Sequence, residues 1–233
     1  MALKRYFLLF ITIIFASAAA EAETHGGSMT KDIHWLGHDT FKISGATVIY
    51  TDPFRLKSPD KADLILITHE HYDHCSPDDV QKLLKADTVI LATSDCAKKL
   101  TGKVRIVKPG DKLVVSGVEI EVVPAYNTNK QFHTKDRGWA GYIFTTGGKR
   151  IYLAGDTDVI PEMKAFKNID IALLPVSGTY VMTADEAAEA ALIIRPKIAI
   201  PMHYGAIVGS QKDADIFAQK LKGKVDVTIL THE

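Results

Sequence analysis

The chain has 233 residues, of which 46% are hydrophobic and 24% charged, as expected for a globular protein with a substantial core. Lysine plus arginine and aspartate plus glutamate number 28 each, so no basic excess predicts nucleic-acid binding. A small molecule is therefore the expected partner, and nothing in the sequence indicates an oligomeric state.

The first 22 residues have the pattern of a secretory signal peptide. Lys4 and Arg5 precede an apolar run over residues 7–15, and Ala20-Glu21-Ala22 offers a cleavage site. The run is short for a membrane span and no stop-transfer segment follows, so we expect cleavage, with an uncleaved anchor as the alternative. This predicts a periplasmic or secreted protein without stable membrane insertion after cleavage.

Beyond a polar segment over 23–30, predicted to be disordered, short apolar runs alternate with turn residues and helix caps. Strands are predicted at 33–35, 40–43, 47–51, 63–67, 88–92, 104–107, 113–115, 118–123, 139–145, 150–153, 169–174, 197–200 and 225–230. Helices are predicted at 78–85, 94–100, 184–194 and 212–221. Hairpins mixed with strand–helix units indicate two mixed sheets face to face with helices outside, in one domain over 31–233.

The most informative motif is Thr-His-Glu-His-Tyr-Asp-His at residues 68–74. It follows an apolar strand, and side chains two positions apart on extended backbone point the same way, so His69 and His71 can bind one ion. Asp73 and His74 can then reach a second ion where the chain turns. Three imidazoles and a carboxylate suit Zn²⁺ or a similar metal, whereas the alternative is a solvated histidine-rich loop.

Two later strands also end on ligand-type residues. Asp156 follows Gly155, which permits a tight turn, and its carboxylate can bridge two cations. The alternative for Asp156 is a turn or helix-cap role. His203 follows the strand before Pro201 in the same manner, and its alternative is a hydrogen-bonded core or loop histidine.

Three further residues are candidates for a role near the metal. The loop over 124–137 offers Asn127 and His133, and His133 is the chemical choice for a third nitrogen because asparagine is a poor ligand for such metals. A mobile or substrate-contacting role is the alternative for His133. Asp52 and His38, also at strand ends, are expected to hold the ligand imidazoles in place from behind.

The two cysteines, Cys75 and Cys96, allow a single disulfide. Export would permit that bridge. Two unpaired thiols, or Cys75 as a metal ligand beside His74, are the alternatives, and the sequence leaves all three open.

These motifs together resemble the metallo-β-lactamase superfamily over residues 31–230, through the 68–74 motif, Gly155-Asp156-Thr157, Pro201-Met-His203-Tyr-Gly205 and Asp52. Trp35-Leu36-Gly37-His38 and Asp52-Pro53-Phe54 are most similar to the branch that holds the ascorbate-phosphate lactonase and the N-acylphosphatidylethanolamine-type phospholipase D. The resemblance implies a four-layer αββα sandwich with a dinuclear Zn²⁺ site, in some members Mn²⁺ or Fe²⁺. The chain departs from that branch at Asn127, where a histidine is expected.

The resulting hypothesis is a metal-dependent hydrolase that uses a metal-bound hydroxide to cleave an ester, lactone or phosphodiester. His69, His71 and His133 would hold one ion, and Asp156 would bridge to a second. That second ion would be held by Asp73, His74 and His203, and Asp73 would also act in catalysis by orienting the nucleophile or passing a proton. The alternative function is an exported metal-binding protein of the same fold without turnover.

Overall fold

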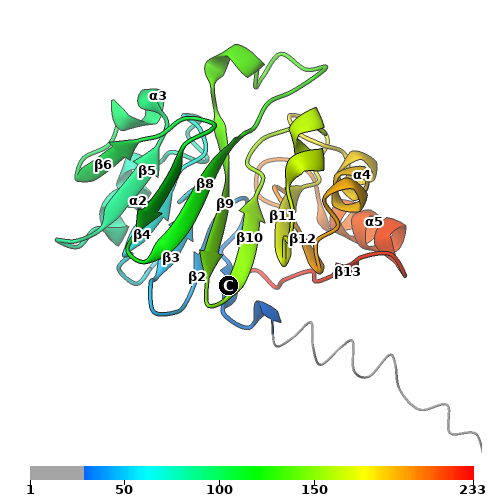
Figure 1. Ribbon diagram of the computed structural model, residues 1–233, viewed down its shortest axis with the longest axis horizontal. Coiled ribbons are helices and arrows are strands. Elements are labelled where there is room, and N and C mark those ends of the chain that lie inside the picture. Colours follow the sequence, from blue (N-terminus) through cyan, green and yellow to red (C-terminus); the bar gives the residue numbers. More distant parts are fainter. Residues whose placement is uncertain (1–28) are drawn as a thin grey trace, which may run out of the picture.

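The structure, a computed structural model, describes residues 29–233, and the predicted signal peptide lies outside that range. Two sheets lie face to face, as Figure 1 shows, with helices on the outside. The predicted four-layer sandwich is confirmed. Among residues 29–233, no helix has the length and apolar character needed to cross a membrane.

The first sheet contains six strands in the order of the chain. They are β1 (Ile33–Trp35), β2 (Phe41–Ile43), β3 (Ile49–Thr51), β4 (Leu64–Leu66), β5 (Val89–Ala92) and β6 (Lys103–Ile106). The pairs from β1 to β3 are antiparallel, and those from β3 to β6 are parallel. Strand β1 therefore runs in the same direction as β3 and β4.

The second sheet has seven strands in the order β13-β12-β11-β10-β9-β8-β7. They are β7 (Lys112–Val115), β8 (Val118–Pro124), β9 (Ala140–Thr146), β10 (Lys149–Leu153), β11 (Ile171–Pro175), β12 (Ile198–Met202) and β13 (Asp226–Val227). The pairs from β10 to β13 are parallel and those from β7 to β10 antiparallel, so β8 runs in the same direction as β10.

Alternation along β4 shows how the core is divided. Leu64 and Leu66 pack in the large core that includes the space between the sheets, whereas Ile65 and the following Ile67 pack in a smaller cluster on the outer face. This is the period-two alternation of a strand buried on both faces. The outer cluster includes residues of α2 (Pro77–Leu83), which begins at the predicted cap Ser76 with Pro77 in its first turn.

Helices α4 (Ala184–Ile194) and α5 (Gln211–Leu221) pack against β11, β12 and β13 of the second sheet (Figure 1). The predicted capping box of α4 is present, because Thr183 accepts a hydrogen bond from the Glu186 amide and the Glu186 carboxylate accepts one from the Thr183 amide. The short α3 (Ser94–Ala97) follows β5 in the first sheet.

The structure differs from the sequence-based expectations at three places. Met29 and Thr30, at the end of the segment expected to be disordered, are helical, and Thr30 is buried. The last strand, β13, has two residues instead of six, because only Asp226 and Val227 pair with β12. Two short 3₁₀ helices, η1 (Lys135–Arg137) and η2 (Pro161–Ala165), were not expected.

Candidate metal centre

The parallel directions of the strands bring their following loops to one edge of the sandwich. The segments that follow β1, β3 and β4 begin at one edge of the first sheet, and the segments that follow β8, β10 and β12 begin at one edge of the second sheet. Each of these segments carries at least one of the residues predicted for the metal centre. The carboxyl ends of strands that run together are a common place for such sites.

The first cluster consists of His69, His71, His133 and Asp156. One ligand atom from each lies within 4.8 Å of the others. The side chains come from the end of β4, the loop after β8 and the segment after β10. The structure therefore brings His133 beside the histidines of the 68–74 motif, as the chemical argument predicted.

A buried tryptophan covers this first cluster. The ring of Trp139 lies 4.8 Å from that of His69, 4.9 Å from that of His71 and 5.4 Å from that of His133, measured between centroids. The indole Nε1 donates a hydrogen bond of 2.6 Å to Asp95, which fixes the ring. Trp139 thus excludes water from one side of the cluster.

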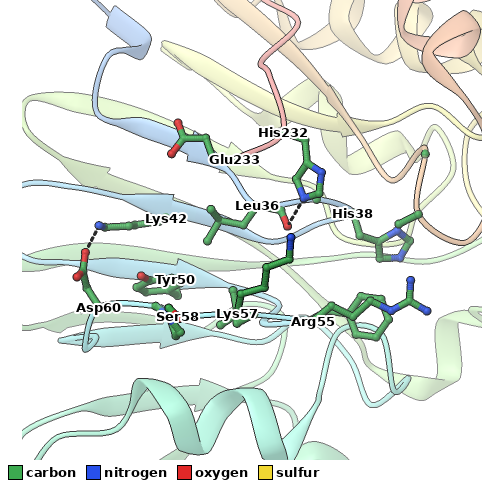
Figure 2. A pocket seen from close by; sticks show the side chains of 16 residues that line it. Leu36, His38, Lys42, Tyr50, Arg55, Lys57, Ser58, Asp60, His232 and Glu233 are labelled. Atoms are coloured by element: carbon green, nitrogen blue, oxygen red, sulfur yellow. Dashed lines mark hydrogen bonds and ion pairs between the residues drawn. The ribbon is translucent and has the colours of Figure 1, made fainter.

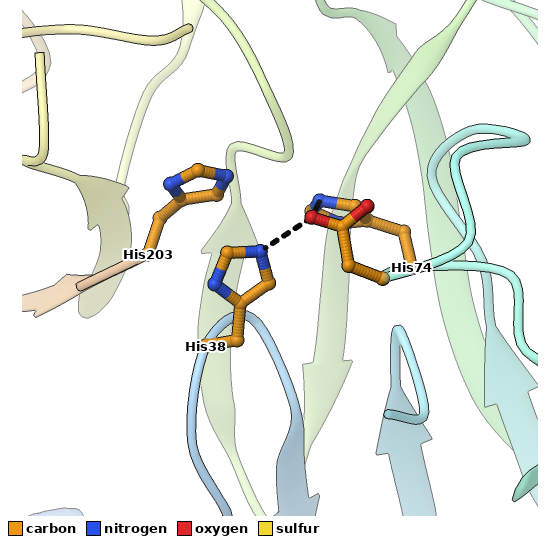
Figure 3. Close-up of side chains that lie close together, drawn as sticks. His38, His74 and His203 are labelled. Atoms are coloured by element: carbon orange, nitrogen blue, oxygen red, sulfur yellow. Dashed lines mark hydrogen bonds and ion pairs between the residues drawn. The ribbon is translucent and has the colours of Figure 1, made fainter. Parts of the chain in front are cut away.

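The second cluster consists of His38, Asp73, His74 and His203, whose ligand atoms also lie within 4.8 Å of one another. Figure 3 shows the three imidazoles converging from separate segments of the chain. The His38 Nε2 atom lies 3.0 Å from Asp73 Oδ2. His38 was expected behind the ligands, and the structure instead places it among the candidate ligands.

Asp156 lies between the two clusters. Its Oδ2 atom is 3.0 Å from His133 Nε2 and 3.3 Å from His203 Nε2, and its Oδ1 atom is 3.5 Å from His74 Nε2. The preceding Gly155 has φ 64°, and a Cβ there would lie 3.0 Å from the Thr68 side chain. The glycine at this turn is therefore required both by the backbone conformation and by close packing.

Asp52 holds His74 from behind, as expected. Its carboxylate accepts hydrogen bonds from the Thr68 amide at 2.8 Å and the Thr68 hydroxyl at 2.7 Å, and His74 Nδ1 lies 2.9 Å away. Because Nδ1 faces this buried carboxylate, Nε2 of His74 faces the centre. Ser177 has the same relation to His203, with Oγ 2.9 Å from Nδ1.

Asn127, the departure from the expected histidine, holds the replacement ligand candidate. Its Oδ1 accepts a hydrogen bond from the His133 amide at 3.0 Å and lies 3.1 Å from His133 Nδ1. Its Nδ2 donates to Asp158 at 3.1 Å and to the Tyr180 carbonyl at 3.0 Å, which fixes the amide orientation. With Nδ1 of His133 facing Asn127, Nε2 faces the cluster.

Asp39 is a buried residue that the sequence analysis missed. Its Oδ2 lies 3.8 Å from His74 Nδ1, and neither carboxylate oxygen has a hydrogen-bond partner within residues 29–233. Burial raises the pKa of Asp39 to about 7, against the opposing effect of His203 and His74. In the sequence, Asp39 directly follows His38 in a segment with a glycine, and this pattern predicts a turn but no role at the metal centre.

Charge differs between the clusters. Burial holds the pKa of His69 well below its usual value and lowers that of His71. Burial also opposes charge on His74 and His203, but the surrounding carboxylates, Asp156 first, outweigh it and raise both pKa values. His69 and His71 therefore favour the neutral imidazole, whereas His74 and His203 hold protons between carboxylates; His38, also in the second cluster, differs from these two because burial lowers its pKa to about 4.

Strained backbone also concentrates here. His38, Asp52 and His203 have φ of 52°, 34° and 61°, a region that residues other than glycine rarely adopt. The Trp35 indole and the His203 amide both donate to the His38 carbonyl, at 2.9 and 3.1 Å, and hold this turn against the centre. Such strain is typical of functional sites.

The donor set fits metal ions. His74 Nε2, His133 Nε2, His203 Nε2 and Asp156 Oδ1 are buried without a hydrogen-bond partner among the described residues, and each of the three nitrogens lies 3.0–3.5 Å from an oxygen of Asp156. Buried polar atoms without partners are costly, and a cation at each cluster would satisfy them. Imidazole nitrogens with carboxylates suit zinc and its neighbours in the first transition series.

The two cysteines are both buried, unbridged thiols. Neither belongs to any of the groups of residues that could hold an ion among the described residues. The structure thus contains two free thiols, one of the three possibilities that the sequence left open.

Comparisons with known proteins agree with this geometry. Residues 32–203 match the family described as the beta-lactamase superfamily domain. The chain is 34% identical over 218 residues to a UPF0173 metal-dependent hydrolase of Thermococcus onnurineus, covering 85% of this chain and 95% of the relative. An Archaeoglobus fulgidus protein of the same description is 31% identical over 220 residues, with the same coverage of each chain.

Two solved structures are also similar. A crystal structure from Parabacteroides distasonis, assigned as a metal-dependent hydrolase, has a TM-score of 0.77 and 41% identity, covering 85% of this chain and 93% of that one. A metallo hydrolase from Ignicoccus hospitalis has a TM-score of 0.70 and 25% identity, covering 85% and 94%. The match to the lactonase and phospholipase branch stays a prediction.

Proposed function

The chain belongs to the metallo-β-lactamase superfamily of metal-dependent hydrolases, and on that basis we propose that its two clusters hold two zinc ions and hydrolyse an ester, lactone or phosphodiester. The observation that carries this proposal is the position of Asp156, whose carboxylate lies 3.0 Å from His133 of the first cluster and 3.3 and 3.5 Å from His203 and His74 of the second. A bridging carboxylate places two cations near each other, as two-metal hydrolysis requires.

Bound ions would lower the pKa of a water molecule and polarise the bond to be cleaved. The protein must hold the ligand nitrogens in place, and Asn127, Asp52 and Ser177 do so from behind. Trp139 keeps solvent away from the histidines of the first cluster. The remaining task is to orient the attacking water.

Asp73 is the residue that we assign to this task. Its side chain is 15% exposed, whereas that of Asp156 is 3% exposed, so Asp73 is the carboxylate that faces the approach of substrate. Burial acts to raise its pKa, but the hydrogen bond with His38 and the charges nearby lower it to about 2. A carboxylate with so low a pKa is a weak base, and it orients a water proton better than it removes one.

The experiment compares metal content and turnover in the purified protein. Elemental analysis should find two ions per chain, and chelation should abolish turnover within a panel of bis(p-nitrophenyl) phosphate, p-nitrophenyl esters and lactones. The Asp73→Asn variant should retain its fold and lose about a hundredfold or more in kcat, the range of a lost acid–base group.

The outcomes separate the two functions considered. Bound metal without turnover on any class of substrate would favour a metal-binding protein, and wild-type kcat in Asp73→Asn would remove Asp73 from the mechanism. The exported location is also a proposal, and it rests on the pattern of residues 1–22 alone.

A further inference from the structure

A groove lies beside the second cluster, on the outer face of the first sheet. It has a volume of about 510 Å³ and is lined by the turn over 36–38, by one residue each of β2 and β3, by the loop over 54–60, the turn at 205–206 and residues 232–233. That volume is in the range of small-molecule pockets. Figure 2 shows His38 at one end of the groove and the Lys42–Asp60 pair at the other.

The groove is continuous with the metal centre through two residues. His38 lines the groove, and its Nε2 bonds to Asp73 of the second cluster. Phe54 also lines the groove, and its ring lies 6.0 Å from that of His38 and 5.8 Å from that of Tyr72. His38 and Phe54 therefore form the boundary between the groove and the metal centre, and a molecule in the groove lies next to a residue that contacts Asp73.

In the groove, the acidic side chains have charged partners among the described residues, whereas two of the basic side chains do not. Both carboxylates have partners, since Asp60 pairs with Lys42 and Glu233 lies 2.9 Å from His34 Nδ1. Within residues 29–233, the Arg55 guanidinium and the Lys57 ammonium have no ion pair or hydrogen bond, and the guanidinium only lies over the Phe54 ring at 4.7 Å. In Figure 2 the Lys57 side chain extends toward His232, and Arg55 lies at the end of the groove where His38 is labelled.

The remaining lining is mostly apolar, with Leu36, Tyr50, Leu56 and Pro59 along the walls. An apolar wall with two unpaired cations favours a ligand with a hydrocarbon part and one anionic group. Arg55 is placed for this role by two backbone hydrogen bonds of its loop, from the Arg55 and Leu56 amides to Asp79 at 2.8 and 3.0 Å.

We propose that this groove is the substrate subsite and that Arg55 and Lys57 select substrates that carry a carboxylate or phosphate a few bonds from the cleaved group. This inference rests on the proposed hydrolase function, because it places the cleaved bond at the metal centre. Arg55 and Lys57 determine specificity, and they take no part in the chemical step.

The kinetic test uses two esters with the same six-carbon acyl chain, mono-p-nitrophenyl adipate and p-nitrophenyl hexanoate. The ratio of their kcat/KM values should favour the adipate in the wild type and fall about tenfold in Arg55→Gln/Lys57→Gln, as expected when about 1.4 kcal/mol of charge interaction is lost. The Arg55→Lys variant should retain most of the preference because it keeps the charge.

The control is Lys212→Gln/Lys222→Gln, which removes the same charge from the exposed surface at and after α5. Its ratio should match that of the wild type, since neither lysine lines the groove. An unchanged ratio in the Arg55/Lys57 variant, or an equal fall in the control, would overturn the inference.

A binding measurement separates this inference from the proposed function. Calorimetry on the metal-loaded protein should show tighter binding of 4-phenylbutyrate than of 4-phenylbutanol, with the difference lost in Arg55→Gln/Lys57→Gln at unchanged metal content. Tighter binding of 4-phenylbutylphosphonate would identify phosphate as the better anion. Anion-selective binding without turnover would contradict the proposed hydrolase function and support the groove as an anion-binding site. Turnover with no anion preference in either assay would contradict only the proposal that the groove is the substrate subsite.

Discussion

The two clusters of the metal centre are similar in size but are held in different ways. In the first, a neutral amide, Asn127, holds His133, and Trp139 covers three imidazoles. In the second, the buried carboxylate of Asp52 holds His74, and a second buried carboxylate, Asp39, lies 3.8 Å from the same imidazole. Loss of Asn127 should therefore affect mainly metal affinity, and loss of Asp52 both metal affinity and folding.

The difference follows from how buried charge and buried amides behave. A buried carboxylate that accepts several hydrogen bonds is part of the folded core, and its removal leaves its donors unsatisfied. Asn127 also bonds to Asp158 and the Tyr180 carbonyl, but it is neutral, so its removal takes no charge from the buried network and costs less. The following variants test this contrast, in order of the size of the expected effect.

The largest effect is expected for Asp156→Asn, because Asp156 is the one carboxylate of residues 29–233 in contact with histidines of both clusters. Loss of its charge should lower metal content at both clusters and reduce kcat/KM about a thousandfold, equivalent to several kcal/mol of charge stabilisation. Elemental analysis and kinetics measure this. The exposed Asp87→Asn serves as control, and full metal content in Asp156→Asn would show that the clusters are independent.

Asp52→Asn should mainly reduce stability. Asp52 accepts two hydrogen bonds from Thr68 and faces His74 Nδ1, and an amide cannot accept from all three donors. We expect a loss of about 2–3 kcal/mol in the free energy of unfolding, measured by urea denaturation of the metal-free protein. A stability within error of the wild type would contradict the contrast between the clusters.

Asn127→Ala should leave the fold intact and weaken the first cluster alone. Removing the amide frees the His133 ring, and loss of such a holding residue typically lowers metal affinity about 10- to 100-fold. Competition with a chelator measures the affinities of the two ions separately. Ser177→Ala is the matched variant for the second cluster, where it should weaken the ion near His203 instead.

The smallest effect is expected outside both clusters, for Asp79→Asn. Asp79 is buried, which would raise its pKa, but hydrogen bonds from Lys82, Ser76 and the loop over 55–56 lower the pKa below the usual 3.8. Because the folded pKa is the lower one, this stabilisation is present above the unfolded value and is lost as pH falls through the folded value.

We therefore expect the wild type to exceed Asp79→Asn by about 1–2 kcal/mol at pH 7, measured by urea denaturation. The difference should shrink below about pH 4. A difference that stays constant down to pH 2 would show that the Asp79 charge is not its source. Metal content should remain that of the wild type, which distinguishes this variant from Asp156→Asn, Asn127→Ala and Ser177→Ala.

Much of the fold was predictable because its signals are local. The Ser76 cap, the Thr183–Glu186 capping box and the alternation along β4 each involve residues within a few positions of one another. The short β13 was overestimated for the same reason. The largely apolar run over 225–230 predicts a strand, but pairing with β12 ends after Val227.

The metal centre was predictable where one short motif carries the geometry. The motif at residues 68–74 places His69, His71, Asp73 and His74 close together because they lie within six positions of one another. The structure assigns the first two to one cluster and the last two to the other. That these residues bind ions stays a prediction, and the variants above test it.

Sequence alone thus determined the strands, the helix caps and the histidine motif, since backbone periodicity and capping act over a few residues. Tertiary structure decided which distant side chains meet. Asn127, at the position where a histidine is expected, holds His133; His38, expected behind the ligands, lies among the candidate ligands; and Asp39 lies beside them from a turn that gave no sign of a metal site. These outcomes depend on how loops from two sheets pack at one edge, and no local pattern records that packing.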